Sequence, residues 1–180
     1  METKKISTSE VNRLLNHGPV VLVTCGESVH NIITIAWITP VSHDPPLLAI
    51  SVSPKRYSCE LIEHAGEFVV NVPPVELLKS VWICGTKSGR QRDKWSEAKL
   101  TKSPSEVVSP PHIAECMAWL ECKVVKSVEV GDHILFVGEV LSASVRKDAF
   151  DHFYHLNPPH QTLHHLGRNH FAVAGRIVKA

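Results

Sequence analysis

The chain has 180 residues, and its 19 Lys and Arg against 18 Asp and Glu give a formal net charge of +1. This balance disfavours a general nucleic-acid-binding protein, which would carry a basic excess. The absence of a run of about 18 apolar residues disfavours a membrane-spanning helix. The first ten residues lack the apolar segment of a secretory signal, so we expect a cytoplasmic protein. The length predicts one domain over residues 1–180, with its core at about 18–178.

Short apolar runs rich in β-branched residues predict the strands of the first half, because such side chains suit a pleated, packed surface. At residues 57–65 the spacing of apolar residues becomes helical, Ser58 is placed to cap the start of a helix, and Gly66 is placed to end it. The expected strands are 20–24, 31–39, 47–53 and 68–72, and the expected short helices are 10–15, 57–65 and 74–81.

The second half carries the longest β pattern. Residues 118–128 and 133–145 are joined by a compact turn and predict a hairpin. Two irregular segments precede it, at 85–94 and 102–111, and a short helix at 148–154 and a β run at 171–178 follow it. Many strands with hairpin-type connections and few helices predict a closed antiparallel barrel whose openings the helices cover.

One segment predicts an anion site. The strand 47–53 ends at a short basic loop containing Lys55 and Arg56, and a helix follows. The start of a helix offers unpaired backbone N–H groups and the positive end of its dipole, and an arginine can bind a phosphate with two parallel hydrogen bonds. Ser53 and Ser58 add hydroxyl groups. The alternative is an ordinary basic loop whose Ser58 only caps the helix.

Three further positions are candidates for binding a planar cofactor. Trp37 stands in a β-branched run and could flank a ring, or it could be a core tryptophan. Asn71 lies inside an apolar strand, where its amide must either bind a ligand or satisfy a loop. His133 begins the second hairpin strand and could hydrogen-bond a cofactor or relay a proton, or it could be structural.

The cysteines and histidines favour no metal centre. The five cysteines are scattered without a C-x-x-C pair, which favours buried thiols over a zinc ribbon or disulfides. Six of the 12 histidines fall between residues 152 and 170, and His152 and His155 could share a helix face. A metalloprotein is therefore a third hypothesis, but H-E-x-x-H is absent and Pro158-Pro159 interrupts the run. Hydrolase, Rossmann and P-loop glycine motifs are also absent.

Taken in order, five segments of this chain resemble the flavin reductase-like family, in its flavoredoxin-type branch of FMN-binding split barrels. The segments are 31–46, 47–58, 66–73, 88–94 and 131–140, and together they span most of the chain. The resemblance implies a mainly-β fold, a six-stranded antiparallel Greek-key split barrel with a few short covering helices. It also implies a homodimer that holds FMN noncovalently near the subunit interface.

The resemblance also implies site residues. Ala36, Trp37 and Thr39 fall where the family lines the flavin ring and ribityl chain, and His133 belongs to a Gly-Asp-His motif beside the flavin. The region 165–171 departs from the family's usual aromatic and glycine run. The resemblance implies that this segment lies over the exposed face of the flavin, so the choice of acceptor and the docking of the nicotinamide stay open. The remaining implied positions are Ser51 and Ser53 at the ring edge, Arg56, Tyr57 and Ser58 at the phosphate, Ser88 and Lys94 in the loop segment, and the polar positions Asn31 and Asn71.

Two functions follow as expectations. The first is an oxidoreductase in which NADH or NADPH reduces bound FMN, which passes electrons to free flavin, ferric iron or a partner protein. The second is a non-enzymatic FMN-binding electron carrier or flavin-holding protein. The sequence leaves the donor, the acceptor and the choice between NADH and NADPH open.

Overall fold

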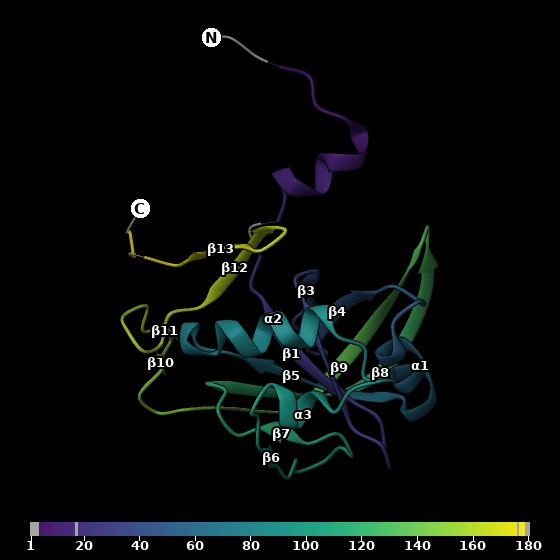
Figure 1. Cartoon of the computed structure of the whole chain (residues 1–180). Helices are drawn as coiled ribbons and strands as arrows, with labels where there is room; N and C mark the ends of the chain where they lie inside the picture. The colour runs from purple at the N-terminus through teal and green to yellow at the C-terminus, as the bar shows by residue number, and fades with distance from the viewer. Residues whose placement is uncertain (1–3, 17, 176, 179–180) are drawn as a thin grey trace.

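The computed structural model describes residues 4–16, 18–175 and 177–178 of the chain (Figure 1). Its helical elements are η1 (Thr8–Leu14), α1 (Tyr57–Ala65), η2 (Val75–Leu77), α2 (Leu78–Thr86) and α3 (Lys94–Glu97). Its strands are β1 (Val21–Cys25), β2 (Asn31–Ile35), β3 (Ile38–Ser42), β4 (Leu47–Val52), β5 (Glu67–Val72), β6 (Lys102–Ser103), β7 (His112–Ile113), β8 (Ala118–Val130), β9 (His133–Val145), β10 (Phe150–Asp151), β11 (Phe153–Tyr154), β12 (Leu163–Gly167) and β13 (His170–Val173).

The main sheet is antiparallel and has seven strands in the order β2-β1-β5-β8-β9-β4-β3. Its two edge strands, β2 and β3, are consecutive in the chain and are linked only by Ala36 and Trp37. The sheet must therefore curl until its edges approach each other. β5 returns beside β1 rather than beside β4, as in a Greek key. The mainly-β split barrel expected from the sequence is confirmed.

The strand count differs from the expected six because the run 31–39 is not one strand. β2 pairs with β1 at one edge of the sheet, whereas β3 pairs with β4 at the other. Between them the carbonyl of Trp37 accepts a hydrogen bond from the amide of Ser51 at 3.0 Å. We call Ala36 and Trp37 the seam, because the two edges of the sheet meet there.

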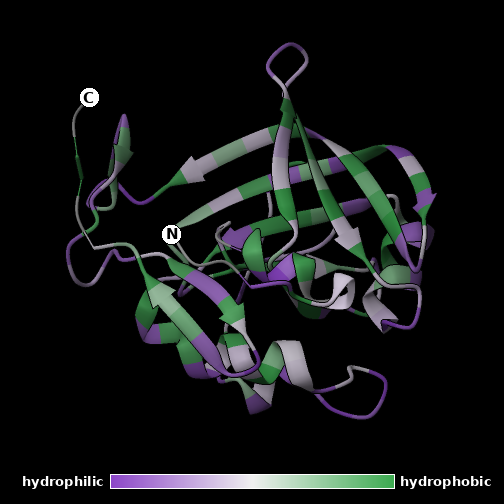
Figure 2. Ribbon diagram, turned by 90° about the horizontal axis from the view of Figure 1, so that it is seen from above, coloured by the Kyte–Doolittle hydropathy of each residue, from purple (hydrophilic) through white to green (hydrophobic). Residues whose placement is uncertain are grey.

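Both faces of the central strands are buried. On β1, Val21, Val23 and Cys25 face the core inside the curled sheet, whereas Leu22 faces a second core beneath α2 and α3. A strand covered on both faces reads as a continuous apolar run. Figure 2 shows hydrophilic residues collecting in the connecting loops and alternating with hydrophobic ones along several strands.

The helix α1 has the bounds expected from the sequence. Gly66 ends it in the left-handed region (φ 66°), and the Gly66 N–H donates to the Ile62 carbonyl at 2.9 Å. Arg56, not Ser58, is the residue that precedes the first turn, so the expected Ser58 cap is wrong. The helix expected over 74–81 is divided into η2 and α2, and α2 continues into the segment expected as a loop.

The helix expected at 148–154 is wrong, because this segment forms the small β10–β11 hairpin. Phe150 pairs with Tyr154 across the hairpin, and their rings pack edge to face with centroids 5.5 Å apart. His152, at the turn, has a positive φ of 63° that a helix would not allow. The last β run is the shorter strand β13, which pairs with β12. Of the expected strand 171–178, residue 176 lies outside the described residues.

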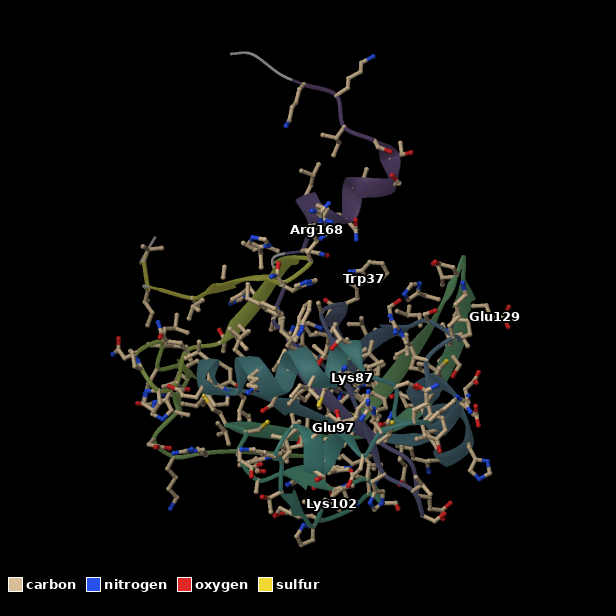
Figure 3. All side chains as sticks on the ribbon, viewed as in Figure 1. Trp37, Lys87, Glu97, Lys102, Glu129 and Arg168 are labelled. Carbon is tan, nitrogen blue, oxygen red and sulfur yellow. The ribbon has the colours of Figure 1, made fainter. Side chains whose placement is uncertain are left out.

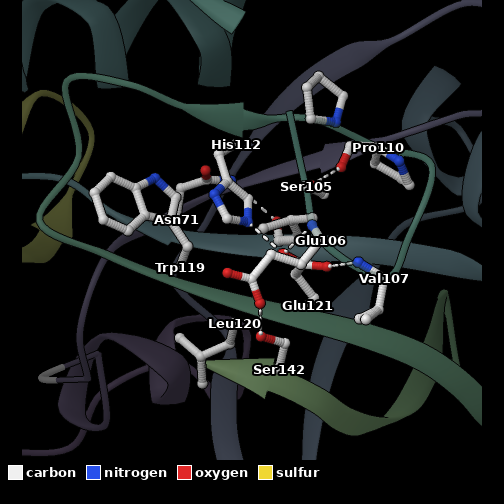
Figure 4. A network of polar contacts seen from close by, with 12 residues as sticks. Asn71, Ser105, Glu106, Val107, Pro110, His112, Trp119, Leu120, Glu121 and Ser142 are labelled. Atoms are coloured by element: carbon white, nitrogen blue, oxygen red, sulfur yellow. Dashed lines mark hydrogen bonds and ion pairs between the residues drawn. The ribbon is translucent and has the colours of Figure 1, made fainter. Parts of the chain in front are cut away.

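A buried carboxylate fixes the irregular segment that precedes the long hairpin. Glu121 on β8 is 1% exposed and accepts hydrogen bonds from the amides of Glu106 and Val107 at 2.8 and 2.7 Å (Figure 4). His112 Nε2 donates to the same carboxylate at 2.7 Å, and its ring stacks on Trp119. Burial raises the pKa of Glu121, but these three hydrogen bonds outweigh burial and hold the pKa below its usual value.

We expect the free energy of unfolding to fall as the pH drops below about 4.5 and through the lower folded-state pKa of Glu121. A carboxyl group with a lowered folded-state pKa stabilises the fold above its unfolded pKa, and protonation removes that contribution. Glu121→Gln should therefore flatten this part of the pH profile in urea unfolding, whereas Glu129→Gln, at an exposed position (Figure 3), should not. Parallel profiles for wild type and Glu121→Gln would contradict this assignment.

None of the helices in the described part of the chain is long and apolar enough to cross a membrane.

Candidate functional site

A cavity of about 410 Å³, lined by Ala36 and Trp37, opens beside the seam, and we call it the seam cavity. Because β2, β3 and β4 converge at the seam, the cavity is bounded by the end of β2 and the end of β4, and the start of β9 closes one side. Six residues expected from the sequence line it: Ala36, Trp37, Ser51, Ser53, Arg56 and His133.

Trp37 and His133 form one wall of the seam cavity. Their ring centroids are 4.8 Å apart, and the Trp37 Nε1–H donates to Asn16 Oδ1 at 3.1 Å. His133 Nδ1 lies 2.7 Å from Asp132 Oδ1. The hydrogen bond from His133 lowers the pKa of Asp132, so the carboxylate is ionised and His133 Nδ1 is the donor. His133 Nε2 is therefore the nitrogen left to meet a ligand.

A second cavity of about 90 Å³ lies at the start of α1, and we call it the basic cavity. Asn31 Nδ2 donates to Ser58 Oγ at 2.8 Å, and this contact does not use the Ser58 hydroxyl proton. Ser58 also lies within hydrogen-bonding reach of the buried Cys25 thiol. The first turn of α1 supplies N–H groups without intrahelical partners. The expected residues that line this cavity are Asn31, Arg56, Tyr57, Ser58, Ser88 and Lys94.

Lys94 is the buried cation of the basic cavity. It is 5% exposed, and its Nζ donates to the carbonyls of Ile32 and Cys84 at 2.7 and 2.8 Å. An ammonium group has three N–H donors, so one remains for a ligand. Burial lowers the pKa of Lys94, and Arg56 nearby lowers it further, while Cys84 and Cys25 act in the opposite direction. A bound anion would relieve the repulsion between the two cations.

The two cavities are continuous, because Ile33 and Arg56 line both of them. The basic cavity offers three cations (Lys55, Arg56 and Lys94), hydroxyl groups and a helix start, whereas the seam cavity offers aromatic walls and β-strand backbone. The arrangement can hold an elongated ligand that has a flat ring system at one end and an anionic group at the other.

Two expected site residues lie outside both cavities. Thr39 follows the seam on β3, where it lines an apolar groove of about 490 Å³ and donates to the Pro40 carbonyl. Asn71 is fully buried, and its amide donates to the carbonyls of Leu22 and Val69. Its Oδ1 accepts from the Ile113 amide at 2.7 Å. Of the two interpretations of Asn71, the structure favours the one in which it satisfies a loop.

Two further segments reach the seam cavity. Asn12, Arg13 and Asn16 come from η1 and the residues after it, which no sequence pattern indicated. His165 comes from β12, in the region 165–171 that the resemblance related to the exposed face of the flavin. Arg13 lies against Gly167, where an added Cβ would overlap its guanidinium. These contacts join the two ends of the chain, so no local spacing could reveal them.

The cysteines and histidines of the described residues provide no group of three that could hold a metal ion. All five cysteines are buried free thiols, and burial raises the pKa of Cys25 and Cys84 to about 12. These two thiols, which approach Lys94, are therefore protonated at neutral pH and poor nucleophiles. His155 and His160 instead contact Asp148.

Gly89 permits the loop after α2 to lie on Asn31, and we expect Gly89→Ala to weaken binding of a phosphate-bearing ligand. An added Cβ would overlap the buried Asn31 amide, which in turn holds Ser58. Overpacking of this kind costs about 1–3 kcal/mol. The control is Gly175→Ala, because a Cβ there meets no atom within 4 Å. Equal affinity of the two variants for FMN, the ligand that the resemblance implies, in fluorescence titrations would show that the Gly89 contact does not matter.

Comparison with known proteins agrees with this geometry. The family model described as flavin reductase like domain matches residues 13–178. An uncharacterized protein of Archaeoglobus fulgidus is 47% identical over 129 residues, which cover 72% of each chain. Among solved structures, flavoredoxin from Methanosarcina acetivorans is similar with a TM-score of 0.87 and 27% identity, covering 100% of this chain and 95% of its own. An FMN-binding domain of a flavin reductases-like enzyme from Shewanella baltica is similar with a TM-score of 0.82 and 27% identity, covering 97% and 95%.

Proposed function

The chain belongs to the flavin reductase-like family, and from this premise we propose that it is an FMN-dependent oxidoreductase. Its donor is NADH or NADPH, and its acceptor is free flavin, ferric iron or a partner protein. The observation that carries the proposal is the junction of the basic cavity with the seam cavity at Arg56 and Ile33. FMN has a flat ring system and a terminal phosphate dianion, which match the two cavities.

The residues fit FMN in the following roles. Arg56, Lys94 and the Ser58 hydroxyl bind the phosphate at the start of α1. Ser51 and Ser53 offer hydrogen bonds to the polar edge of the ring from β4 and the turn after it. Trp37 and His133 cover one side of the ring and exclude water from it. His133 holds its Nδ1 proton on Asp132 and presents Nε2 to the cavity.

When bound, FMN would supply a ring that can take a hydride from a reduced nicotinamide, leaving the nicotinamide oxidised, and can pass the two electrons to one free flavin, to two ferric ions or to a partner protein. The chain contributes orientation and shielding, since hydride transfer depends on geometry more than on a general base.

Anaerobic mixing of the FMN-loaded protein with NADH or NADPH tests the proposal. We expect the flavin absorbance to bleach at a rate compatible with turnover. Bleaching by dithionite or a protein donor alone would instead support the second candidate, a non-enzymatic FMN-binding electron carrier. The similarity to a protein named flavoredoxin favours this alternative.

A homodimer is part of the proposal. The groove of about 490 Å³ beside β3 and β4 is largely apolar, with Ile38, Leu47 and Val140 among its walls, and a second copy would remove it from water. Light scattering should give twice the mass of one chain, and Leu47→Glu should reduce it. A monomeric wild-type protein would contradict this assignment.

A further inference from the structure

The segment that contains η1 brings an arginine to the seam cavity. Asn12, Arg13 and Asn16 of this segment line the cavity together with residues of β4 and β9. Asn16 is buried, and its Oδ1 accepts the hydrogen bond from the Trp37 indole N–H at 3.1 Å. This bond fixes the end of the segment to the seam, and Arg13 stands three residues before it.

The turn between β12 and β13 leaves room for the Arg13 guanidinium. Gly167 has a φ of 128°, and an added Cβ there would overlap Arg13 Nη1 and Cζ. A side chain at position 167 would therefore both strain the turn and displace the guanidinium. Figure 1 shows η1 outside the main sheet, close to the β12–β13 hairpin. Arg13 is exposed and lines the seam cavity, so its guanidinium lies at the rim of this cavity.

The charge at the seam cavity is of one sign. No Asp or Glu is found among the described residues that line it. The nearby carboxylate of Asp132 is held on His133 Nδ1 at 2.7 Å, and its side chain is 94% exposed, so solvent screens its charge. The titratable residues that line the cavity are Arg13, Arg56, His133 and His165.

Arg13 carries the uncompensated charge of this set. Among the side chains that the structure describes, no carboxylate forms an ion pair with Arg13. Arginine stays protonated in proteins, so this charge is permanent. Arg56, in contrast, stands at the junction with the basic cavity, where the phosphate of FMN would balance its charge. The end of the site that would hold the ring therefore has Arg13 as its permanent cation.

A positive charge beside a flavin ring affects the two oxidation states differently. The oxidised ring is neutral. When it takes up two electrons and one proton, it becomes an anion, and a neighbouring cation attracts this anion but not the neutral ring. The cation therefore makes the reduced form bind more tightly than the oxidised form, which raises the reduction potential.

We propose that Arg13 raises the reduction potential of the bound flavin by placing its guanidinium charge beside the ring. This role favours uptake of electrons from the donor and leaves the phosphate to the residues of the basic cavity. The inference rests on the proposed function, which puts the ring in the seam cavity, and it adds a residue that tunes the cofactor.

The test is a redox titration of the FMN-loaded protein with dithionite and a reference dye in the absence of oxygen, which needs neither nicotinamide nor turnover. We expect Arg13→Gln to reduce the preference for reduced over oxidised FMN about tenfold, because a charge is lost at an exposed site that solvent partly screens. For a two-electron couple this lowers the midpoint potential by about 30 mV. The affinity for oxidised FMN, titrated by fluorescence, should change little.

Two further variants separate the charge from the structure of η1. Arg13→Lys keeps the positive charge and should recover most of the potential that Arg13→Gln loses. Lys5→Gln is the matched control, because Lys5 is an exposed cation just before η1 that lines neither the seam cavity nor the basic cavity. Its midpoint potential should equal that of the wild type.

If Arg13 only held η1 in place, Arg13→Gln would weaken oxidised and reduced FMN equally and leave the potential unchanged. That result, or an Arg13→Lys potential as low as that of Arg13→Gln, overturns the inference, and the proposed function stands. If the potential shifts as expected but neither NADH nor NADPH reduces the wild type, the donor named in the proposed function is overturned and the inference about Arg13 stands. A wild type that does not bind FMN overturns both.

Discussion

Replacing Arg56 with alanine will weaken FMN binding by about 10- to 150-fold, which corresponds to the loss of a charge-assisted hydrogen bond of about 1.5–3 kcal/mol. Binding of riboflavin will stay unchanged, because riboflavin has no phosphate. Arg56 lies where the basic and seam cavities meet, next to the start of α1. Flavin fluorescence quenching, titrated with each ligand in parallel, measures the two affinities.

The control for Arg56→Ala is Arg92→Ala. Arg92 is also an exposed arginine, it pairs with Glu97 at 3.3 Å, and it lines neither cavity. Its removal should change neither affinity. Equal loss of FMN and riboflavin affinity in Arg56→Ala would instead place Arg56 against the ring and move the phosphate elsewhere.

Lys94→Met will lower the free energy of unfolding by about 2–5 kcal/mol, because it leaves the buried carbonyls of Ile32 and Cys84 without donors. These two carbonyls belong to β2 and α2, so Lys94 ties the helix to the edge of the sheet. The same change removes a cation from the basic cavity, and FMN affinity should fall with stability. Urea unfolding, with and without added FMN, measures both effects.

Lys87→Met is the matched control for Lys94→Met. Lys87 follows α2 directly and is exposed (Figure 3), so its replacement should change the unfolding free energy by no more than about 0.5 kcal/mol. If Lys94→Met proves as stable as wild type, the two carbonyls must find other partners, and Lys94 would act on the ligand alone.

The parts of the candidate site that the sequence predicted are local in the chain. Strand β4, the basic loop and α1 follow one another within residues 47–65, so strand ends, basic residues and helix spacing can be read together. Eleven of the thirteen expected site residues line the two joined cavities. Their roles remain predictions until a ligand is measured.

The two expected residues outside the cavities show what local pattern misses. Trp37 and Thr39 are two residues apart, but Trp37 belongs to the seam and lines the seam cavity, whereas Thr39 lies on β3 and lines the apolar groove. Asn71 has the polarity of a ligand-binding residue, but its hydrogen bonds go to strands and loops that are distant in sequence. In both cases the role of the residue depends on contacts with residues that are distant in the sequence: β4 for Thr39, and Leu22 and Ile113 for Asn71.

By itself, the amino-acid sequence determined the class of fold, the long hairpin and the bounds of α1, because apolar spacing and turn residues act over a few positions. Tertiary structure alone decided that one expected strand breaks into β2 and β3, since a sheet must curl before its edges can meet. It also decided that η1, near the start of the chain, reaches the seam cavity and that Arg168 stands over α2. Such contacts depend on how the sheet closes, and a closed sheet brings together residues that no local pattern relates.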